Sequence, residues 1–203
     1  MTRVAPDGSG LATAPRYGLD IETDTTSDGL DPERSSVVAV AVVGPGVARV
    51  VEPRGSGEPE LLADLDELLA ALPPGVLVTW NGRGFDLPFL RRRAELLGVP
   101  IGLRIDGDTG EATWHGHRHL DGLRPYRADV GRTLGLSCAL KPLARLVGER
   151  PVEVDRRRIH ELDADELRAY VLSDARLAVA LVDRRWPAVA GWVDRAPRPG
   201  PED

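Results

Sequence analysis

The order in which strand and helix patterns follow one another constrains the fold of this chain more than any other feature of its sequence. Short apolar segments with strand character come first, and strand and helix patterns then alternate. The predicted strands are Tyr17–Glu22, Val37–Val43, Val47–Val51 and Val76–Trp80, and the predicted helices are Glu60–Leu72, Phe85–Leu97 and Ala164–Val182. This order is typical of an α/β domain.

Two further regions carry weaker patterns. Residues 102–126 contain an Asp/Gly-rich turn followed by an alternating histidine segment, and they predict a pair of strands. From Ala128 onward the chain reads as mainly helical. The 203 residues are 42% hydrophobic, which is enough to bury one core. We therefore expect one domain over residues 16–190, with flexible tails at 1–15 and 191–203, where Gly and Pro interrupt regular structure.

Composition excludes several classes of protein. Cys138 is the only cysteine, so no internal disulfide can form, and the first residues do not resemble a signal peptide. No segment is long and apolar enough for a membrane span, and the simplest expected location is the cytoplasm. The formal net charge of −6 argues against a protein that coats nucleic acid, but an enzyme that grips a strand locally remains compatible with it.

Carboxylates occur in the first predicted strand at Asp20 and Glu22. Side chains alternate along a strand, so these two acids share one face, while Leu19 and Ile21 share the other. In a sheet covered on both faces the two carboxylates would repel each other. A divalent cation bound between them would replace this repulsion with attraction to the ion. The alternative is an edge strand with a solvated acidic face.

Asp86 follows a Gly-rich turn between a predicted strand and a predicted helix. A carboxylate at this position interacts favourably with the positive end of the helix dipole. Helix capping is therefore a sufficient explanation for Asp86 taken alone. A ligand role depends on the other acidic segments.

The last predicted helix has an apolar stripe interrupted by one acid, Asp174. A buried carboxylate is normally paired, protonated or bound to a metal, and an ion pair with a residue such as Arg145 is the alternative to a metal. Tyr170 lies one turn earlier on the same face. Asp163 and Glu166 form a predicted capping box and need no catalytic role.

An acidic cluster drawn from a strand, a strand-to-helix junction and a helix suits hard cations such as Mg²⁺ or Mn²⁺. Two such ions can activate a water and stabilise the departing oxygen in phosphodiester hydrolysis. Metal-dependent phosphodiester hydrolysis is therefore the chemistry that these residue types favour.

The same segments resemble the motifs of the 3′-to-5′ exonucleases of the DEDD superfamily. The three motifs are matched, in order, by Asp20-x-Glu22, Asn81-x-x-x-Phe85-Asp86 and Tyr170-x-x-x-Asp174. The sister subgroup carries His five residues before the last Asp, where this chain has Ala169, so the resemblance is to the tyrosine (DEDDy) subgroup. Roughly residues 16–186 are similar to the proofreading exonuclease domains of family-B DNA polymerases.

This resemblance implies a ribonuclease H-like fold, with a central mixed β-sheet flanked by helices on both faces. It also implies two Mg²⁺ or Mn²⁺ ions. Asp20, Glu22 and Asp174 would bind the first ion, Asp20 would also contact the second, and Asp86 would hold the second.

The resemblance also implies a substrate, namely the 3′ end of single-stranded nucleic acid, with DNA favoured over RNA and nucleoside monophosphates as products. Tyr170 would orient the attacking water, and Asn81 and Phe85 would lie near the 3′-terminal nucleotide. The segment from Ser137 to Lys141 resembles a Ser-Leu-Lys stretch of the group, but two extra residues separate its Ser from its Leu. Protein partners cannot be inferred from the sequence.

Other interpretations remain open at this point. A noncatalytic nucleic-acid-binding or adaptor module could use the same fold, and an endonuclease could use similar acids. His115, His117 and His119 would share one face of a strand and could bind a transition metal, although a structural or surface role is preferred. The run Arg91–Arg93 is read as a solvated helix face that could also guide a phosphate backbone.

Overall fold

The computed structural model describes residues 11, 13–26 and 29–195. Residues 1–10, 12 and 196–203 of the two predicted tails lie outside this part of the chain. Within it, no helix combines the length and the apolar character needed to cross a membrane.

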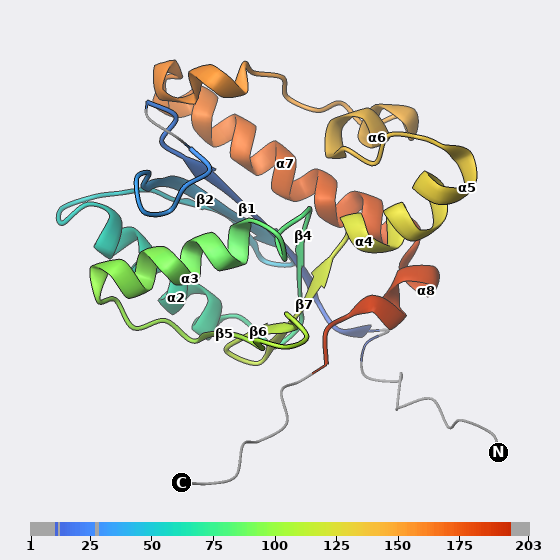
Figure 1. The fold of residues 1–203 in the computed structure, drawn as a ribbon, viewed down its shortest axis with the longest axis horizontal. Coiled ribbons are helices and arrows are strands. Elements are labelled where there is room, and N and C mark those ends of the chain that lie inside the picture. The colour runs from blue at the N-terminus through green and yellow to red at the C-terminus, as the bar shows by residue number, and fades with distance from the viewer. Residues whose placement is uncertain (1–10, 12, 27–28, 196–203) are drawn as a thin grey trace, which may run out of the picture.

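A seven-stranded mixed sheet forms the centre of the molecule (Figure 1). Its strands are β1 (Arg16–Thr23), β2 (Val37–Gly44), β3 (Val47–Val51), β4 (Val76–Thr79), β5 (Leu103–Ile105), β6 (Ala112–Trp114) and β7 (His117–Asp121). They lie in the order β3-β2-β1-β4-β7-β6-β5. The short strand β4 pairs in parallel with β1 and β7, and the remaining pairs are antiparallel. The predicted mixed sheet is confirmed.

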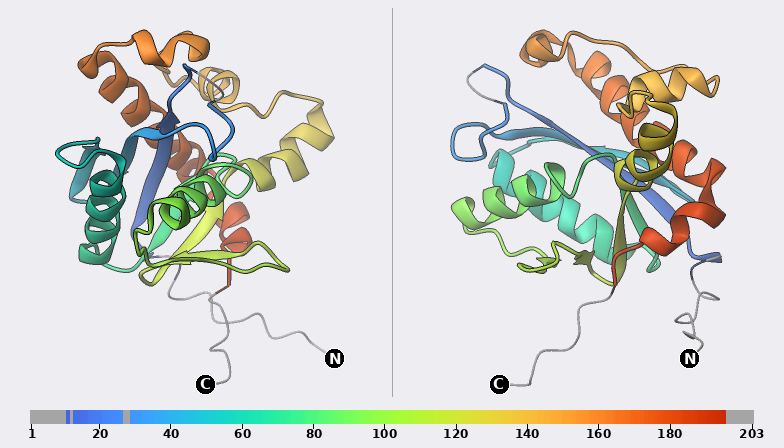
Figure 2. Two further views of the ribbon diagram at one scale, coloured as in Figure 1. Left: turned by 60° about the vertical axis from the view of Figure 1, so that its left-hand side comes forward. Right: turned by 45° about the vertical axis from the view of Figure 1, so that its right-hand side comes forward.

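Helices cover both faces of this sheet (Figures 1 and 2). The longer ones are α2 (Glu58–Ala71), α3 (Asp86–Leu97) and α7 (Ala164–Arg184), and the short ones are α4 (Leu123–Tyr126), α5 (Arg132–Leu134), α6 (Leu140–Leu146) and α8 (Trp186–Val189). A π-helix spans Arg127–Gly131, and 3₁₀ turns span Arg156–Glu161 and Ala190–Trp192. Helices α2 and α3 pack on one face, and α7 packs on the other. The predicted α/β class is therefore correct.

Strand β1 shows how sequence alternation builds the two layers. Leu19 and Ile21 enter the large core beneath α2 and α3. Gly18 faces α7, where an added β-carbon would overlap the carbonyl oxygen of Ala175. The absence of a side chain at Gly18 therefore lets the α7 backbone approach β1 closely.

Residues 102–126, which were predicted to form a pair of strands, contain three antiparallel strands, β5, β6 and β7. His115 lies in the tight β6–β7 turn with a positive φ of 46°, so it does not share a strand face with His117 and His119. His117 accepts from the Gly75 amide at 3.2 Å and contacts the Leu69 carbonyl, whereas His119 contacts Thr79 and Asp194. The three imidazoles thus have separate structural contacts and form no common metal site.

The segment after Ala128 is less helical than its sequence suggests. Gly135, with a φ of 64°, ends α5, and residues 149–155 run without regular structure before the 3₁₀ turn. The helix that follows begins with the predicted capping box of Asp163 and Glu166. Towards the C-terminus, Val193 and Asp194 are buried against the sheet, beyond the predicted domain end at residue 190.

Candidate metal centre

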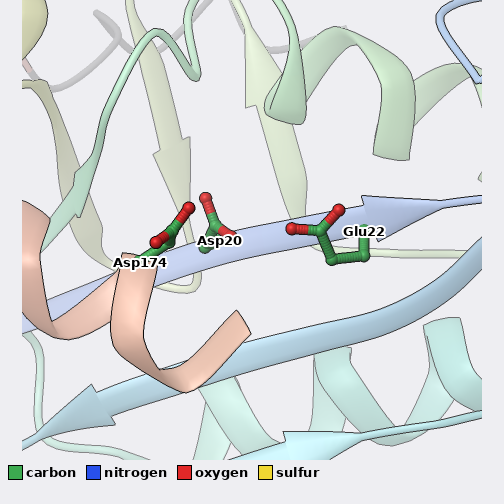
Figure 3. Close-up of side chains that lie close together, drawn as sticks. All are labelled: Asp20, Glu22 and Asp174. Atoms are coloured by element: carbon green, nitrogen blue, oxygen red, sulfur yellow. The ribbon is translucent and has the colours of Figure 1, made fainter. Parts of the chain in front are cut away.

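Asp20 and Glu22 of β1 and Asp174 of α7 form a compact carboxylate cluster (Figure 3). One oxygen of each residue lies within 4.8 Å of the others, and these three residues could hold a metal ion. Asp20 and Glu22 are partly exposed, whereas Asp174 is 2% exposed. The shared face of Asp20 and Glu22 agrees with the prediction from strand alternation.

Small residues on the neighbouring strand make room for this cluster. In the β1–β2 pairing, Asp20 lies opposite Ala41 and Glu22 lies opposite Ala39. Both alanines pack in the apolar layer beneath α7, together with Val171 and Ala175 of that helix. Asp174 thus reaches the acids of β1 because the surrounding contacts hold α7 close to the sheet.

Lys141 is the cation beside Asp174. Its Nζ lies 3.5 Å from Asp174 Oδ1 and 3.9 Å from the centre of the Tyr170 ring, and it donates to the Val152 carbonyl at 2.8 Å. The alternative partner suggested by the sequence, Arg145, instead forms an ion pair with Glu153. Asp174 therefore has a cationic neighbour, but this neighbour is Lys141 and not Arg145, which was the example given for the alternative to metal binding.

Asp86 is the first residue of α3, and its side chain is buried. Burial raises the pKa of Asp86 from 3.8 to about 7, and the nearby Asp121 carboxylate adds to this rise. The backbone N–H groups of Asp86 itself and of Ile21 oppose it. The contact with Ile21 locates the Asp86 carboxylate beside the stretch of β1 that carries Asp20 and Glu22, although Asp86 is not one of the three clustered acids.

Asp121 is a site residue that the sequence reading missed. This buried acid at the end of β7 accepts hydrogen bonds from the backbone N–H groups of Asn81 at 2.9 Å, Leu123 at 3.0 Å and Arg83 at 3.4 Å. Asn81 has a positive φ of 75°, a conformation that Asn tolerates better than most residues. Asp121 therefore fixes the turn that leads into Asp86. An acid at a strand end was its only sequence signal.

A cavity of about 1100 Å³ contains most of the predicted site. Its lining includes the acids Asp20, Glu22, Asp86 and Asp174, the predicted substrate contacts Asn81 and Phe85, and the cations Arg127, Lys141 and Arg145. Ser137 also lines it. Tyr170 does not; its side chain is fully buried under Lys141. The structure thus brings six of the seven predicted site residues to one cavity.

The run Arg91–Arg93 does not contribute to this cavity. Arg91 pairs with Glu95, Arg92 pairs with Glu33 and Glu95, and Arg93 pairs with the buried Glu58. These ion pairs account for all three side chains. A role in guiding a phosphate backbone is not supported by this arrangement.

Comparisons with known proteins agree with the geometry. A family model described as the RNase_H superfamily matches residues 18–162. A protein named DNA polymerase 1 from Aeropyrum pernix is 34% identical over 132 residues, which are 62% of this chain and 14% of that protein. A protein named DNA polymerase from Thermococcus aggregans is 40% identical over 60 residues, which are 30% of this chain and 3% of that protein.

A solved structure gives the same result for the fold. The family B DNA polymerase from the hyperthermophilic archaeon Pyrobaculum calidifontis matches with a TM-score of 0.74 and 25% identity. The match covers 86% of this chain and 25% of that one, so the chain spans only a small part of the polymerases it resembles. The predicted ribonuclease H-like fold and the predicted likeness to family-B polymerases are confirmed.

Proposed function

Because the chain belongs to the RNase_H superfamily, we propose that it is a divalent-metal-dependent 3′-to-5′ exonuclease. It would remove nucleoside monophosphates from the 3′ end of single-stranded nucleic acid, with DNA preferred over RNA. The observation that carries this proposal is the carboxylate cluster of Asp20, Glu22 and Asp174, which opens into a cavity that Asp86 also lines. The cytoplasm remains the proposed location.

The donor set fits Mg²⁺ or Mn²⁺. All of its ligand atoms are carboxylate oxygens, which these hard cations prefer. Two like charges no more than 4.8 Å apart repel by roughly 3 kcal/mol or more at an effective dielectric of about 20, and a divalent ion would convert this repulsion into attraction. Asp20, Glu22 and Asp174 would hold one ion, and Asp20 and Asp86 would hold a second.

When bound, the two ions would supply an activated water and stabilise the departing 3′ oxygen. The other residues would position the substrate. Asn81 and Phe85, which line the cavity at its Gly-rich turn, would contact the 3′-terminal nucleotide. Tyr170 would orient the attacking water, and because its side chain is fully buried here, this role requires its hydroxyl to become accessible when substrate binds.

Digestion of a 5′-labelled single strand tests the proposal. With Mg²⁺ or Mn²⁺ the protein should shorten the strand stepwise, while a circular single strand stays intact. Asp20→Ala and Asp174→Ala should each lower the rate at least about 1000-fold, because each removes an oxygen ligand that supports the reacting charge. Asp165→Ala, an exposed acid on the same helix as Asp174, is the matched control and should keep its activity.

Two results would reject the exonuclease. Opening of the circle would indicate an endonuclease. An intact linear strand with either metal, under conditions in which a control exonuclease works, would favour a noncatalytic module. Calorimetric titration with Mn²⁺ then tests the noncatalytic module further. An exonuclease site predicts Mn²⁺ binding by the wild-type protein that the Asp20→Ala variant lacks. Matched DNA and RNA strands test the proposed preference for DNA.

A further inference from the structure

The cations that line the cavity differ in their contacts. Lys141 contacts Asp174, Tyr170 and the Val152 carbonyl, and Arg145 pairs with Glu153. Arg127 is exposed, and no carboxylate in the described part of the chain pairs with it. Arg127 is therefore the cavity cation whose charge is available to a ligand.

Arg127 begins the π-helix, and this helix brings a second arginine close to it in the fold. The backbone N–H of Arg132 donates to the carbonyl of Arg127, so the two residues are one turn apart. Arg132 is also exposed and, among the described residues, has no ion-pair partner. π-helical turns are rare and occur frequently at functional sites.

The acid within this turn does not cancel the two positive charges. Asp129 forms an ion pair with Arg185, which follows α7. Arg127 lines the cavity, whereas Arg132, one turn later, lies outside its lining. Figure 2 shows the segment of α4, the π-helix and α5 reaching away from the sheet. Arg127 and Arg132 thus form a basic edge beside the cavity.

A single strand with its 3′ end in the cavity needs such an edge. The cavity interior is acidic, and the chain carries a formal net charge of −6, so phosphates farther along the strand gain no general attraction. Exposed guanidinium groups bind phosphate oxygens well, and Arg127 in the cavity lining and Arg132 one turn away are two such groups. The ion-paired Arg91–Arg93 run offers no comparable surface.

We propose that Arg127 and Arg132 bind two backbone phosphates of the substrate strand, on the 5′ side of its terminal nucleotide. This inference rests on the proposed function only for the direction of the strand. The binding itself requires no hydrolysis. It assigns the nucleic-acid interface to the segment 127–132, outside the acidic cluster.

Anisotropy of a labelled single strand of about 12 nucleotides, measured in EDTA, tests the inference. The double variant Arg127→Gln/Arg132→Gln should bind about tenfold more weakly. The slope of log K against log salt should fall by about 1.4, since each phosphate contact contributes about 0.7 on a single strand. The lysine variant Arg127→Lys/Arg132→Lys keeps both positive charges, so it should keep most of the salt slope.

The control variant is Arg49→Gln/Arg104→Gln, which removes two exposed arginines of β3 and β5.

The outcomes are distinguishable from failure of the proposed function. If the glutamine variant binds with the affinity and salt slope of the control variant, the inference is overturned. An equal loss of affinity for a dinucleotide would also overturn it, because a dinucleotide has a single internucleotide phosphate and cannot contact both arginines in the proposed way. If binding depends on both arginines but the wild-type protein hydrolyses nothing, the interface stands and the exonuclease is rejected.

Discussion

At the scale of single residues, Asp86 shows how strongly the fold changes the chemistry of a carboxyl group. In an unfolded chain the pKa of this group is 3.8, and burial raises it to about 7 in the folded protein. At pH values between 3.8 and about 7, the Asp86 carboxyl group therefore keeps its proton in the folded state and has lost it in the unfolded state. Without metal, the contribution of Asp86 to the free energy of unfolding falls as pH rises through this window and levels off above about pH 7.

Replacing Asp86 with Asn tests this sign. Asn cannot ionise, so the stability of Asp86→Asn relative to wild type should be greater at about pH 8 than at about pH 5. Urea denaturation in EDTA measures the two free energies. Asp165→Asn, at an exposed position, is the matched control. A stability difference that is the same at both pH values would contradict the role of burial.

At the scale of elements, the site depends on the contact between β1 and α7. Asp20 and Glu22 belong to the strand, and Asp174 belongs to the helix, so their spacing follows from how closely the two elements pack. Gly18 permits this approach because its position lies against the α7 backbone at Ala175. A side chain at Gly18 would move the third carboxylate away from the other two.

Gly18→Ala should therefore lower both stability and activity. The added methyl meets a backbone oxygen that cannot rotate away, and overpacking of this kind costs about 1–3 kcal/mol. Urea denaturation reports the loss of stability, and Mn²⁺ calorimetry reports the weakened site. Gly107→Ala is the matched control, because a β-carbon there meets no atom within 4 Å. Equal effects of the two substitutions would show that α7 does not depend on this close approach.

At the scale of the whole molecule, a buried polar network joins the end of the described chain to the site. Asp194 Oδ2 accepts from the Ala112 amide and lies 3.0 Å from His119 Nδ1, and Asp194 Oδ1 lies 3.3 Å from Arg83 Nη1. His119 Nε2 in turn contacts Thr79 Oγ1 at 2.8 Å. Because Arg83 belongs to the Gly-rich turn before Asp86, this network connects residue 194 with the turn that leads into the candidate site.

Asp194→Ala should be strongly destabilising for this reason. Removing one member of a buried charged network leaves the polar groups of its partners without a counterpart. This typically lowers the free energy of unfolding by about 3–5 kcal/mol. Asp194→Asn should cost less, since its amide oxygen can still accept a hydrogen bond. Asp183→Ala, which breaks a partly exposed pair with Arg16, should change stability by less than about 1 kcal/mol. Urea midpoints of the three variants check this order, and a similar cost for Asp183→Ala and Asp194→Ala would contradict it.

The sequence by itself determined the elements and the faces that they present. Alternation in β1 separates Asp20 and Glu22 from Leu19 and Ile21, and the helical stripe turns Asp174 towards the core, because both periods follow from local backbone geometry. The motif order was enough to predict the ribonuclease H-like fold.

The tertiary structure alone decided the partners of those residues. Lys141 rather than Arg145 lies beside Asp174, Asp121 holds the turn before Asp86, and Arg185 pairs with Asp129. Each of these contacts joins residues whose separation along the chain follows no helical or strand period. Such pairings depend on how the packed elements meet in space, and no local pattern of side chains encodes them.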